Sequence, residues 1–235
     1  MSTFRFKQFE VAQDRTAMKV GTDGVLLGAW AKITGTEQNI LDIGTGTGLI
    51  ALMMAQRSSA QNIIGVEIDP LSAQQASENM ASSPWSSRLS VEQTPIQNFT
   101  PAQKFDLIVS NPPYFVDSLL AKGESRTIAR HTTELSFEDL VKSVTRLLSI
   151  EGRFALILPT AEAQLFDNVA EGVLYPTRRS FICGKRGGEI KRIMSEYSLT
   201  KPDEIIDEKI AIRDTPPNDY SLEYRAITAD FYLKF

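Results

Sequence analysis

The feature that most restricts the fold is the stretch Ile40–Ile50, where a short apolar run contains an acid and three glycines then follow at alternate positions. It reads Ile-Leu-Asp-Ile-Gly-Thr-Gly-Thr-Gly-Leu-Ile, and apolar residues continue to Ala55. Glycine accepts a positive φ and lets the backbone approach a ligand, and a helix start presents unpaired N–H groups. The stretch therefore predicts a strand, a tight turn and a helix at a ligand-binding edge of a sheet. A glycine-rich turn without a ligand is the simpler alternative.

The spacing of the glycines separates two kinds of nucleotide-like ligand. A dinucleotide-binding turn has Gly-x-Gly-x-x-Gly, but here Leu49 stands where that pattern needs its third glycine. The order Asp-x-Gly-x-Gly-x-Gly instead resembles the first motif of Rossmann-like, class I methyltransferases that use S-adenosylmethionine (SAM). That resemblance implies that Asp42, Gly44, Gly46 and Gly48 bind the cofactor, with Asp42 ordering the loop and facing the methionine end of SAM. A cap on the following helix is the alternative role for Asp42.

Composition limits the chemistry and the compartment. The chain has 235 residues, a formal net charge of −4, a single cysteine (Cys183) and a single histidine (His131). A single cysteine excludes a disulfide framework. One cysteine and one histidine also disfavour a zinc site, so we expect no metal. A catalytic triad would depend on His131 alone. The N-terminus lacks the apolar core of a signal peptide, and no apolar run is long enough for a membrane span. We therefore expect a cytoplasmic protein that does not contact the membrane.

From Ile40 onward, strand-like and helix-like segments alternate. Strands are expected at 40–43, 62–68, 88–92, 105–110 and 153–158, and helices at 48–57, from Asp69, from Ser136 and near 161–172. Nearly continuous apolar runs at 107–109 and 156–158 are typical of central parallel strands covered on both faces. Residues 178–185 and 190–199 predict an antiparallel hairpin at the sheet edge. The pattern predicts an α/β fold with a seven-stranded, mostly parallel sheet.

We expect one methyltransferase domain over residues 1–235, in three parts. Residues 1–38 form a small strand and helix element in which Thr22 or Asp23 is the expected helix N-cap. Residues 39–200 form the SAM-binding catalytic core, and residues 201–235 add strands at 209–213 and 228–235.

Further cofactor contacts are expected at the ends of the next two strands. Glu67 follows the last glycine by 19 residues, a position where an acid can accept both ribose hydroxyls, although an exposed strand-end carboxylate is the alternative. Enzymes that use SAM often place an acid after the third strand for the adenine amino group, but Pro95 occupies that place here. Adenine would then depend on the backbone at Ile96, or on Gln97 or Asn98.

The tetrapeptide Asn111-Pro112-Pro113-Tyr114 directly follows the strand at 105–110 and is the predicted acceptor site. A proline-rich turn is the alternative, but the carboxyl ends of strands are where α/β sheets bind ligands. The Asn111 amide oxygen and a carbonyl fixed by the two prolines can each accept one N–H of an amino group. Tyr114 offers a flat face to a planar substrate. Together they would orient an amino nitrogen toward the methyl group without a strong base.

The glycine motif and Asn-Pro-Pro-Tyr together resemble the methyltransferases that modify N6 of adenine, N4 of cytosine or the glutamine amide of release factors. The segments 18–30, 129–131 and 220–233 are similar to the bacterial tRNA1(Val) (adenine-37-N6)-methyltransferase family, so the resemblance spans nearly the whole chain. It implies SAM as methyl donor, tRNA as substrate and N6 of adenosine 37 as target. We also expect a monomer, and a lid over SAM formed by Lys19, Gly21 and Thr22.

A tRNA substrate adds two requirements. The target base must leave its stack, and Tyr114 could stack on it. Phosphates need positive charge, and the basic residues of the predicted hairpin could supply it. A hairpin whose charges are only solvated is an equally weighted alternative. The candidate RNA-binding residues are Arg126, Arg130, Lys185, Arg186, Lys191 and Arg192.

Three other functions stay open from the sequence. Methylation of a protein glutamine shares the same motif, but only Met1–Asn39 precedes the first strand, whereas those enzymes usually carry a helical N-terminal domain. Methylation of adenine in DNA or rRNA is a second option, although no target-recognition domain is evident. A non-catalytic RNA-binding protein that keeps the fold is the third.

Overall fold

The computed structural model describes residues 2–16, 18–112, 135–214 and 219–234. The first half contains β1 (Thr3–Arg5), β2 (Glu10–Ala12), α1 (Thr22–Trp30), β3 (Asn39–Ile43), α2 (Leu49–Arg57), β4 (Asn62–Glu67), α3 (Pro70–Ala81), β5 (Leu89–Gln93), the 3-10 turn η2 (Ile96–Asn98) and β6 (Phe105–Ser110). The second half contains α5 (Phe137–Leu147), β7 (Leu148–Pro159), α6 (Thr160–Ala170), β8 (Tyr175–Lys185), β9 (Ile190–Ser198), β10 (Ile206–Arg213) and α7 (Leu222–Thr228).

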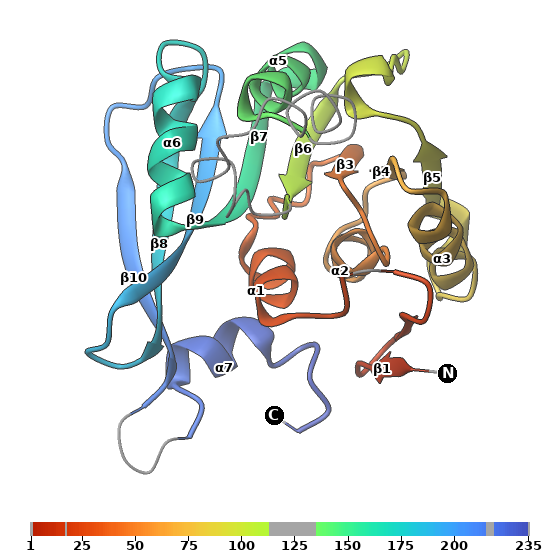
Figure 1. Ribbon diagram of the computed structural model, residues 1–235, viewed down its shortest axis with the longest axis horizontal. Helices are drawn as coiled ribbons and strands as arrows, with labels where there is room; N and C mark the ends of the chain where they lie inside the picture. The colour runs from red at the N-terminus through yellow and green to blue at the C-terminus, as the bar shows by residue number, and fades with distance from the viewer. Residues whose placement is uncertain (1, 17, 113–134, 215–218, 235) are drawn as a thin grey trace, which may run out of the picture.

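The main sheet confirms the predicted α/β class. Its order is β10-β8-β9-β7-β6-β3-β4-β5, from β10 on the left of Figure 1 to β5 on the right. The pairs from β7 to β5 are parallel, and β9 is antiparallel to both of its neighbours. The described sheet has eight strands rather than seven, because β10 pairs in parallel with β8. The β8–β9 hairpin therefore lies one strand in from the edge instead of at the edge.

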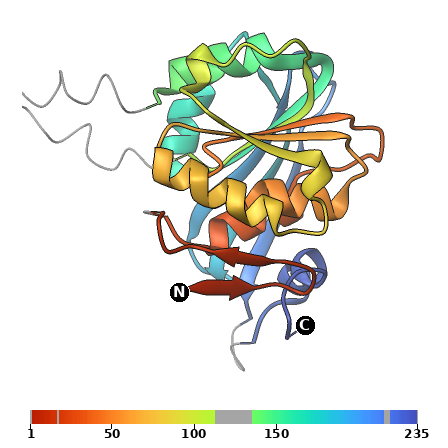
Figure 2. The ribbon, with the colours of Figure 1, turned by 90° about the vertical axis from the view of Figure 1, so that its right-hand side faces the viewer.

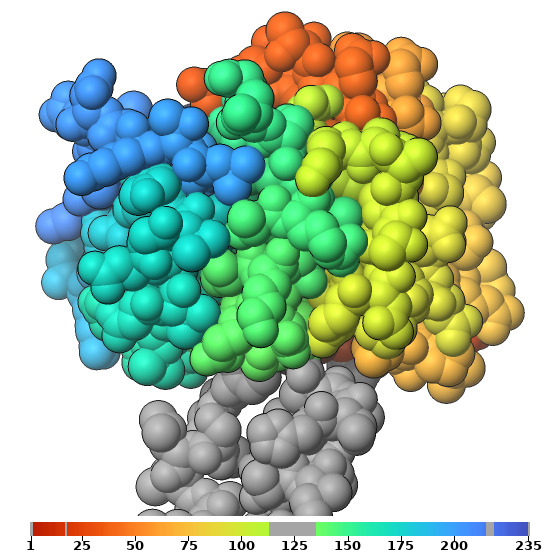
Figure 3. All heavy atoms as spheres, turned by 90° about the horizontal axis from the view of Figure 1, so that it is seen from above, coloured from red at the N-terminus to blue at the C-terminus, as the bar shows by residue number. Residues whose placement is uncertain are grey.

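Helices cover both faces of the sheet (Figure 2). One apolar core contains α1, α2 and the inward side chains Ala155 and Ile157 of β7. The other contains α5, α6 and the alternate β7 residues Phe154, Leu156 and Leu158. Figure 3 looks onto the second face, where α6 and α5 lie side by side. Because successive strand residues point to opposite faces, the continuous apolar run of β7 supplies both cores at once.

Capping residues explain where several helices begin. Asp69 accepts from Ser72 N (2.7 Å) with Pro70 in the first turn of α3, and Ser136 accepts from Asp139 N (3.1 Å) at α5, so both predicted starts are confirmed. The predicted cap of α1 is wrong. Its N-cap is Gly21, without a side-chain cap, and Thr22 and Asp23 lie inside the first turn.

The C-terminal segment differs from the expected strand at 228–235. Ser221 caps α7 by accepting from Tyr224 N (3.0 Å), and Tyr224, Thr228 and Phe231 are buried at helical spacing. The segment then packs on the N-terminal strands, where Lys7 N donates to Phe231 O (2.9 Å). Strands β1 and β2 and helix α7 lie on the α1 side of the sheet, far from α5 (Figure 2).

Candidate cofactor and acceptor site

The order of the strands places a topological switch point between β3 and β6. From β3 the chain proceeds outward through β4 to β5, and it then returns to the other side of β3 with β6 and β7. Open α/β sheets bind ligands at the carboxyl ends of strands at such a switch point. The glycine loop leaves β3 here and Asn111 leaves β6 here. The two strands stay joined at their last register pair, where Ser110 Oγ donates to Ile43 O (3.0 Å).

The glycine loop has the conformation that the sequence predicts. Gly44, Gly46 and Gly48 have φ values of +70°, +55° and +81°, which a residue with a side chain rarely adopts. The N–H groups of Gly44 and Thr45 both donate to Val66 O, at 2.9 and 3.1 Å, so β4 holds the loop in place. Gly48 is the N-cap of α2.

Asp42 is buried at the end of β3. Its Oδ2 accepts from Thr45 Oγ1 (2.6 Å) and from Ala51 N (3.1 Å), so the carboxylate both orders the loop and holds the first turn of α2. Its Oδ1 is buried and has no hydrogen-bond partner among the described residues. Burial raises the pKa of Asp42 to about 7 although Thr45 and Ala51 oppose the shift, and the charge of Glu67 adds to it. A cation next to Oδ1 would relieve this penalty.

Glu67 ends β4 beside the same loop and is only 9% exposed. The exposed-carboxylate alternative therefore does not apply. Oε2 accepts from Gly46 N (2.9 Å), and Oε1 accepts from Ile68 N (2.9 Å) and Asp69 N (3.0 Å). A carboxylate offers about four lone-pair positions, so binding to both hydroxyls of a ribose would require one of these backbone donors to share or leave. The ribose contact stays a prediction.

The turn η2 follows β5 and lies next to Glu67. Thr94 N donates to Glu67 O (3.0 Å), which brings the turn beside the end of β4. Ile96 is buried, and its carbonyl accepts from Arg146 Nη2 (3.0 Å). Gln97 and Asn98 are exposed. The three residues predicted to contact adenine therefore lie in one turn: the buried Ile96, through its backbone, and these two polar residues.

Asn111 is partly buried directly after β6, and Pro112 behind it is buried. The Asn111 Oδ1 atom is buried and has no hydrogen-bond partner among the described residues. Its Nδ2 faces α1, where a Cβ atom added to Gly24 would lie 3.9 Å away. Pro113, Tyr114, Arg126, Arg130 and His131 lie outside the described residues.

The predicted lid residues lie just before α1. Lys19 and Thr22 are exposed and Gly21 is the N-cap of the helix. Val20 N donates to Gln13 Oε1 (2.7 Å), and the buried Gln13 thereby fixes the segment. Since the first turn of α1 lies near Asn111, these residues are close to the switch point, and a lid function stays a prediction.

The basic hairpin reaches the same edge of the sheet, because Arg192 is in register with Pro159 at the carboxyl end of β7. Lys185 and Lys191 are exposed. Arg186 instead pairs with Asp214 (2.6 Å) and Glu223 (2.8 Å), and Arg192 pairs with Asp23 (2.9 Å). Partners so distant in the chain could not be recognised from the sequence, which presents all four cations alike.

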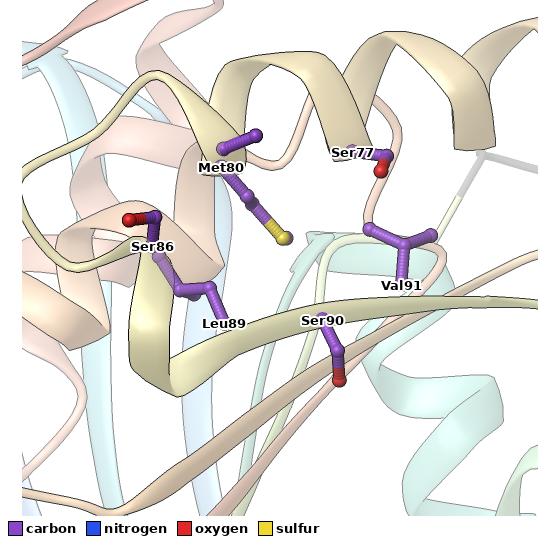
Figure 4. A pocket seen from close by; sticks show the side chains of 7 residues that line it. Ser77, Met80, Ser86, Leu89, Ser90 and Val91 are labelled. Carbon is purple, nitrogen blue, oxygen red and sulfur yellow. The ribbon is translucent and has the colours of Figure 1, made fainter.

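A cavity of about 170 Å³ lies elsewhere, between α3 and β5 (Figure 4). It is lined by Ser77, Met80, Ala81, Ser86, Leu89, Ser90 and Val91, none of which is ionisable. The Met80 side chain points from α3 toward β5. The cavity faces the first residues of β5 and is therefore not part of the site at the carboxyl ends of the strands.

Comparison with known proteins identifies the family. The profile of the methyltransferase small domain matches residues 18–158. A tRNA1(Val) (adenine(37)-N6)-methyltransferase of Bacteroides thetaiotaomicron is 47% identical over 232 residues, which cover 98% of this chain and 97% of the relative. The protein of the same name in Pseudoalteromonas translucida is 43% identical over 235 residues, which are 100% of both chains. The chain belongs to the tRNA1(Val) (adenine(37)-N6)-methyltransferase family.

Solved structures agree on the fold of this family member. A predicted O-methyltransferase from Agrobacterium tumefaciens superposes with a TM-score of 0.71 at 15% identity, covering 89% of this chain and 96% of that one. Its likeness shows the fold alone. The described residues of this methyltransferase contain no group of three or more His, Cys, Asp or Glu that could hold a metal ion. Within the same ranges, no helix has the length and apolar character needed to cross a membrane.

Proposed function

We propose that this protein transfers the methyl group of SAM to N6 of an adenosine in tRNA, and that the target is adenosine 37 of tRNA1(Val). The observation that supports this most is the buried Asn111 Oδ1, which has no partner among the described residues and lies at the switch point beside the glycine loop. The relatives' name supplies the substrate, because those proteins are called tRNA1(Val) (adenine(37)-N6)-methyltransferases.

The residues beside the switch point fit SAM. Asp42 Oδ1 is a buried acceptor with no partner among the described residues, at the place expected for the cationic methionine end. Glu67 and the turn at Ile96 lie side by side, as ribose and adenine would require. The glycine loop lacks side chains where the cofactor must approach the backbone. When bound, SAM supplies the electrophilic methyl group.

Asn111 and Pro112 would act on the acceptor by orientation. Asn111 Oδ1 accepts one N–H of the adenine amino group and the Pro112 carbonyl accepts the other, which turns the nitrogen lone pair toward the methyl group. These acceptors also favour the positive charge that develops on nitrogen as the N–C bond forms. No strong base is needed, because the nitrogen becomes acidic once it is methylated and then loses its proton to water.

We infer that Lys185 and Lys191 contact tRNA phosphates. Both are exposed at the carboxyl edge of the sheet, and a positive surface there would hold the RNA while the target base is flipped toward Asn111. Arg186 is already paired with two acids and is better suited to hold the hairpin turn.

The Asn111→Ala variant tests the central residue of this proposal. We expect its turnover on unmodified tRNA to fall by about a hundredfold to a thousandfold, because the amino group loses its orienting acceptor. The Kd for SAM, measured by calorimetry, should stay unchanged. Asn168→Ala, at an exposed asparagine of α6, is the matched control and should retain full turnover. An Asn111→Ala enzyme that lost SAM affinity but kept its turnover would contradict the assignment.

A further inference from the structure

Helix α1 packs on α2, the helix that follows the glycine loop, and its first turn also lies near the acceptor asparagine. A Cβ atom at Gly24 would lie 3.1 Å from Leu49 Cδ2 and 3.9 Å from Asn111 Nδ2. One turn later, a Cβ atom at Gly28 would lie only 2.5 Å from Met53 Sδ. Residues four apart share a helix face, so the two glycines allow α1 to approach α2 closely along one line. The position of α1 is therefore coupled to Asn111.

The last turn of α1 is fixed by two arginines. Arg57 Nη1 donates to two backbone carbonyls at this end, at 2.9 and 2.8 Å. Arg178 donates to Trp30 O (2.8 Å), and its guanidinium lies 3.8 Å from the centre of the Trp30 ring. Trp30 Nε1 in turn donates to Glu208 Oε1 of β10 (2.6 Å). This end of the helix cannot shift without breaking buried contacts.

The first turn of α1 is tied to the sheet by an ion pair. Arg192 Nε lies 2.9 Å from Asp23 Oδ2, and the two side chains are 31% and 24% exposed. Arg192 lies near the start of β9, opposite Pro159, at the carboxyl edge where the site lies. Asp23 lies in the first turn of α1 and is not its N-cap residue, which is Gly21.

We infer that Asp23 and Arg192 are positioning residues for methyl transfer, and that their ion pair holds the first turn of α1 beside the Asn111 amide. Asn111 Oδ1 has no partner among the described residues, so no hydrogen bond to that oxygen fixes the amide plane there before substrate arrives. The first turn of α1 lies on the Nδ2 side, where a Cβ atom added at Gly24 would be 3.9 Å from Nδ2, and we expect the position of this turn to influence the orientation of the amide. This inference rests on the proposed function of Asn111.

The role of Arg192 can be separated from the RNA contact that its sequence suggests. If Arg192 bound phosphate, the Asp23→Ala substitution would remove a carboxylate that competes with phosphate and would tighten RNA binding while kcat stayed the same. If Arg192 positions α1, the same substitution lowers kcat while the KM for tRNA and the Kd for SAM change little. The two roles therefore predict effects on different kinetic constants.

The test is a steady-state comparison of Asp23→Ala with the exchanged pair Asp23→Arg/Arg192→Asp on unmodified tRNA. We expect kcat to fall by about tenfold or more in Asp23→Ala, because small displacements of a positioned group are costly, and we expect part of it to return in the exchanged pair. Glu10→Ala is the matched control, since it removes an exposed ion pair with Arg5 and should leave kcat unchanged. If Asp23→Ala fails to fold, Asp23→Asn replaces it.

An unchanged kcat in Asp23→Ala, or a lower KM for tRNA as the only effect, would overturn the inference. Asn111→Ala measured in parallel distinguishes the two levels of failure. An inactive Asn111→Ala beside a fully active Asp23→Ala removes only the positioning role. A fully active Asn111→Ala overturns the proposed role of Asn111 and the positioning role with it.

Discussion

The two ends of the sheet treat their buried carboxylates in opposite ways. At the carboxyl end, Asp42 and Glu67 accept only from backbone N–H groups and one threonine hydroxyl, and within the described ranges neither pairs with a cationic side chain. At the amino end, Glu37 precedes β3 and accepts from Thr34 N (2.9 Å), Thr34 Oγ1 (2.8 Å) and the Arg153 guanidinium. Asp42 and Glu67 at the carboxyl end therefore lack a counter-charge among the described residues, whereas Glu37 at the amino end is neutralised by Arg153.

The pKa values reflect this difference. Burial raises the pKa of Asp42 to about 7. Burial would also raise the pKa of Glu37, but hydrogen bonds from Thr34 and Arg153 outweigh it and lower the pKa to about 2. A buried acid without a cation destabilises the fold, and proteins retain such groups mainly where a ligand supplies the missing charge. The ammonium and sulfonium groups of SAM would supply it here.

The largest expected effect is on cofactor affinity. Asp42→Asn should weaken SAM binding by about a hundredfold, because it removes one partner of a buried charge pair. The unliganded variant should be at least as stable as the wild type, since the cost of burying the charge disappears. Calorimetry with SAM and thermal melting measure the two quantities. Asp106→Asn, at the opposite end of the sheet, is the control, and an unchanged SAM Kd in Asp42→Asn would break the comparison.

Glu37→Gln should have the opposite profile. We expect a loss of about 2–3 kcal/mol in the free energy of unfolding, because the partly buried Arg153 guanidinium is left without its anion. SAM affinity should not change, since Glu37 lies at the other end of β3. Denaturant titration and calorimetry provide both values. A variant with wild-type stability but weak SAM binding would contradict the division between the two ends.

The same pair of acids predicts two slopes of stability against pH. Between about pH 2 and 4.5 the unfolded chain binds a proton at Glu37 that the folded chain does not, so stability rises with pH there. Between about pH 3.8 and 7 the folded chain keeps the Asp42 proton that the unfolded chain has lost, so this contribution falls as the pH rises. Asp42→Asn should lose the second slope only. Parallel curves for this variant and the wild type from pH 4 to 7 would show that Asp42 is not destabilising.

The smallest effect is expected at the surface. Arg186 joins the β8–β9 turn to Asp214 and Glu223, and its hydrogen bonds lower the pKa of Glu223 to about 2. Because these groups are exposed, Arg186→Ala should lower the Tm by about 2 °C or less. The difference from the wild type should shrink in high salt. A large loss of stability that salt does not reduce would mean that the ion pairs of Arg186 behave like the Glu37–Arg153 pair and not like surface contacts.

The sequence predicts best those features that depend on neighbouring residues. The alternating glycines, the caps at Asp69 and Ser136 and the apolar runs of β6 and β7 all act within a few residues, and the structure confirms the elements that they predict. From the sequence we expect a strand at 228–235 and no helix at α7, whereas the buried residues Tyr224, Thr228 and Phe231 have helical spacing. The start of this helix is signalled by Ser221, which has the residue type of an N-cap.

The candidate site was predicted only in part, for the same reason. The positions of Asp42, Glu67 and Asn111 follow from strand ends, whereas the pairing of Asp23 with Arg192 joins residues far apart in the chain. The sequence alone is compatible with a helix-capping role for Asp23 and an RNA-binding role for Arg192. Only the fold shows that the two residues form an ion pair. Charge alone does not show which cations are already neutralised, and the hairpin arginines illustrate this.

The most direct test of the account is methyl transfer from tritiated SAM to three acceptors: tRNA that lacks the modification, a release factor and duplex DNA. Digestion of the labelled product to nucleosides would locate the methyl group. We expect label in tRNA as N6-methyladenosine with the wild-type enzyme, and almost no label with the Asn111→Ala enzyme. Label on the release factor or DNA instead of tRNA, or none on any acceptor while SAM still binds, would contradict the account.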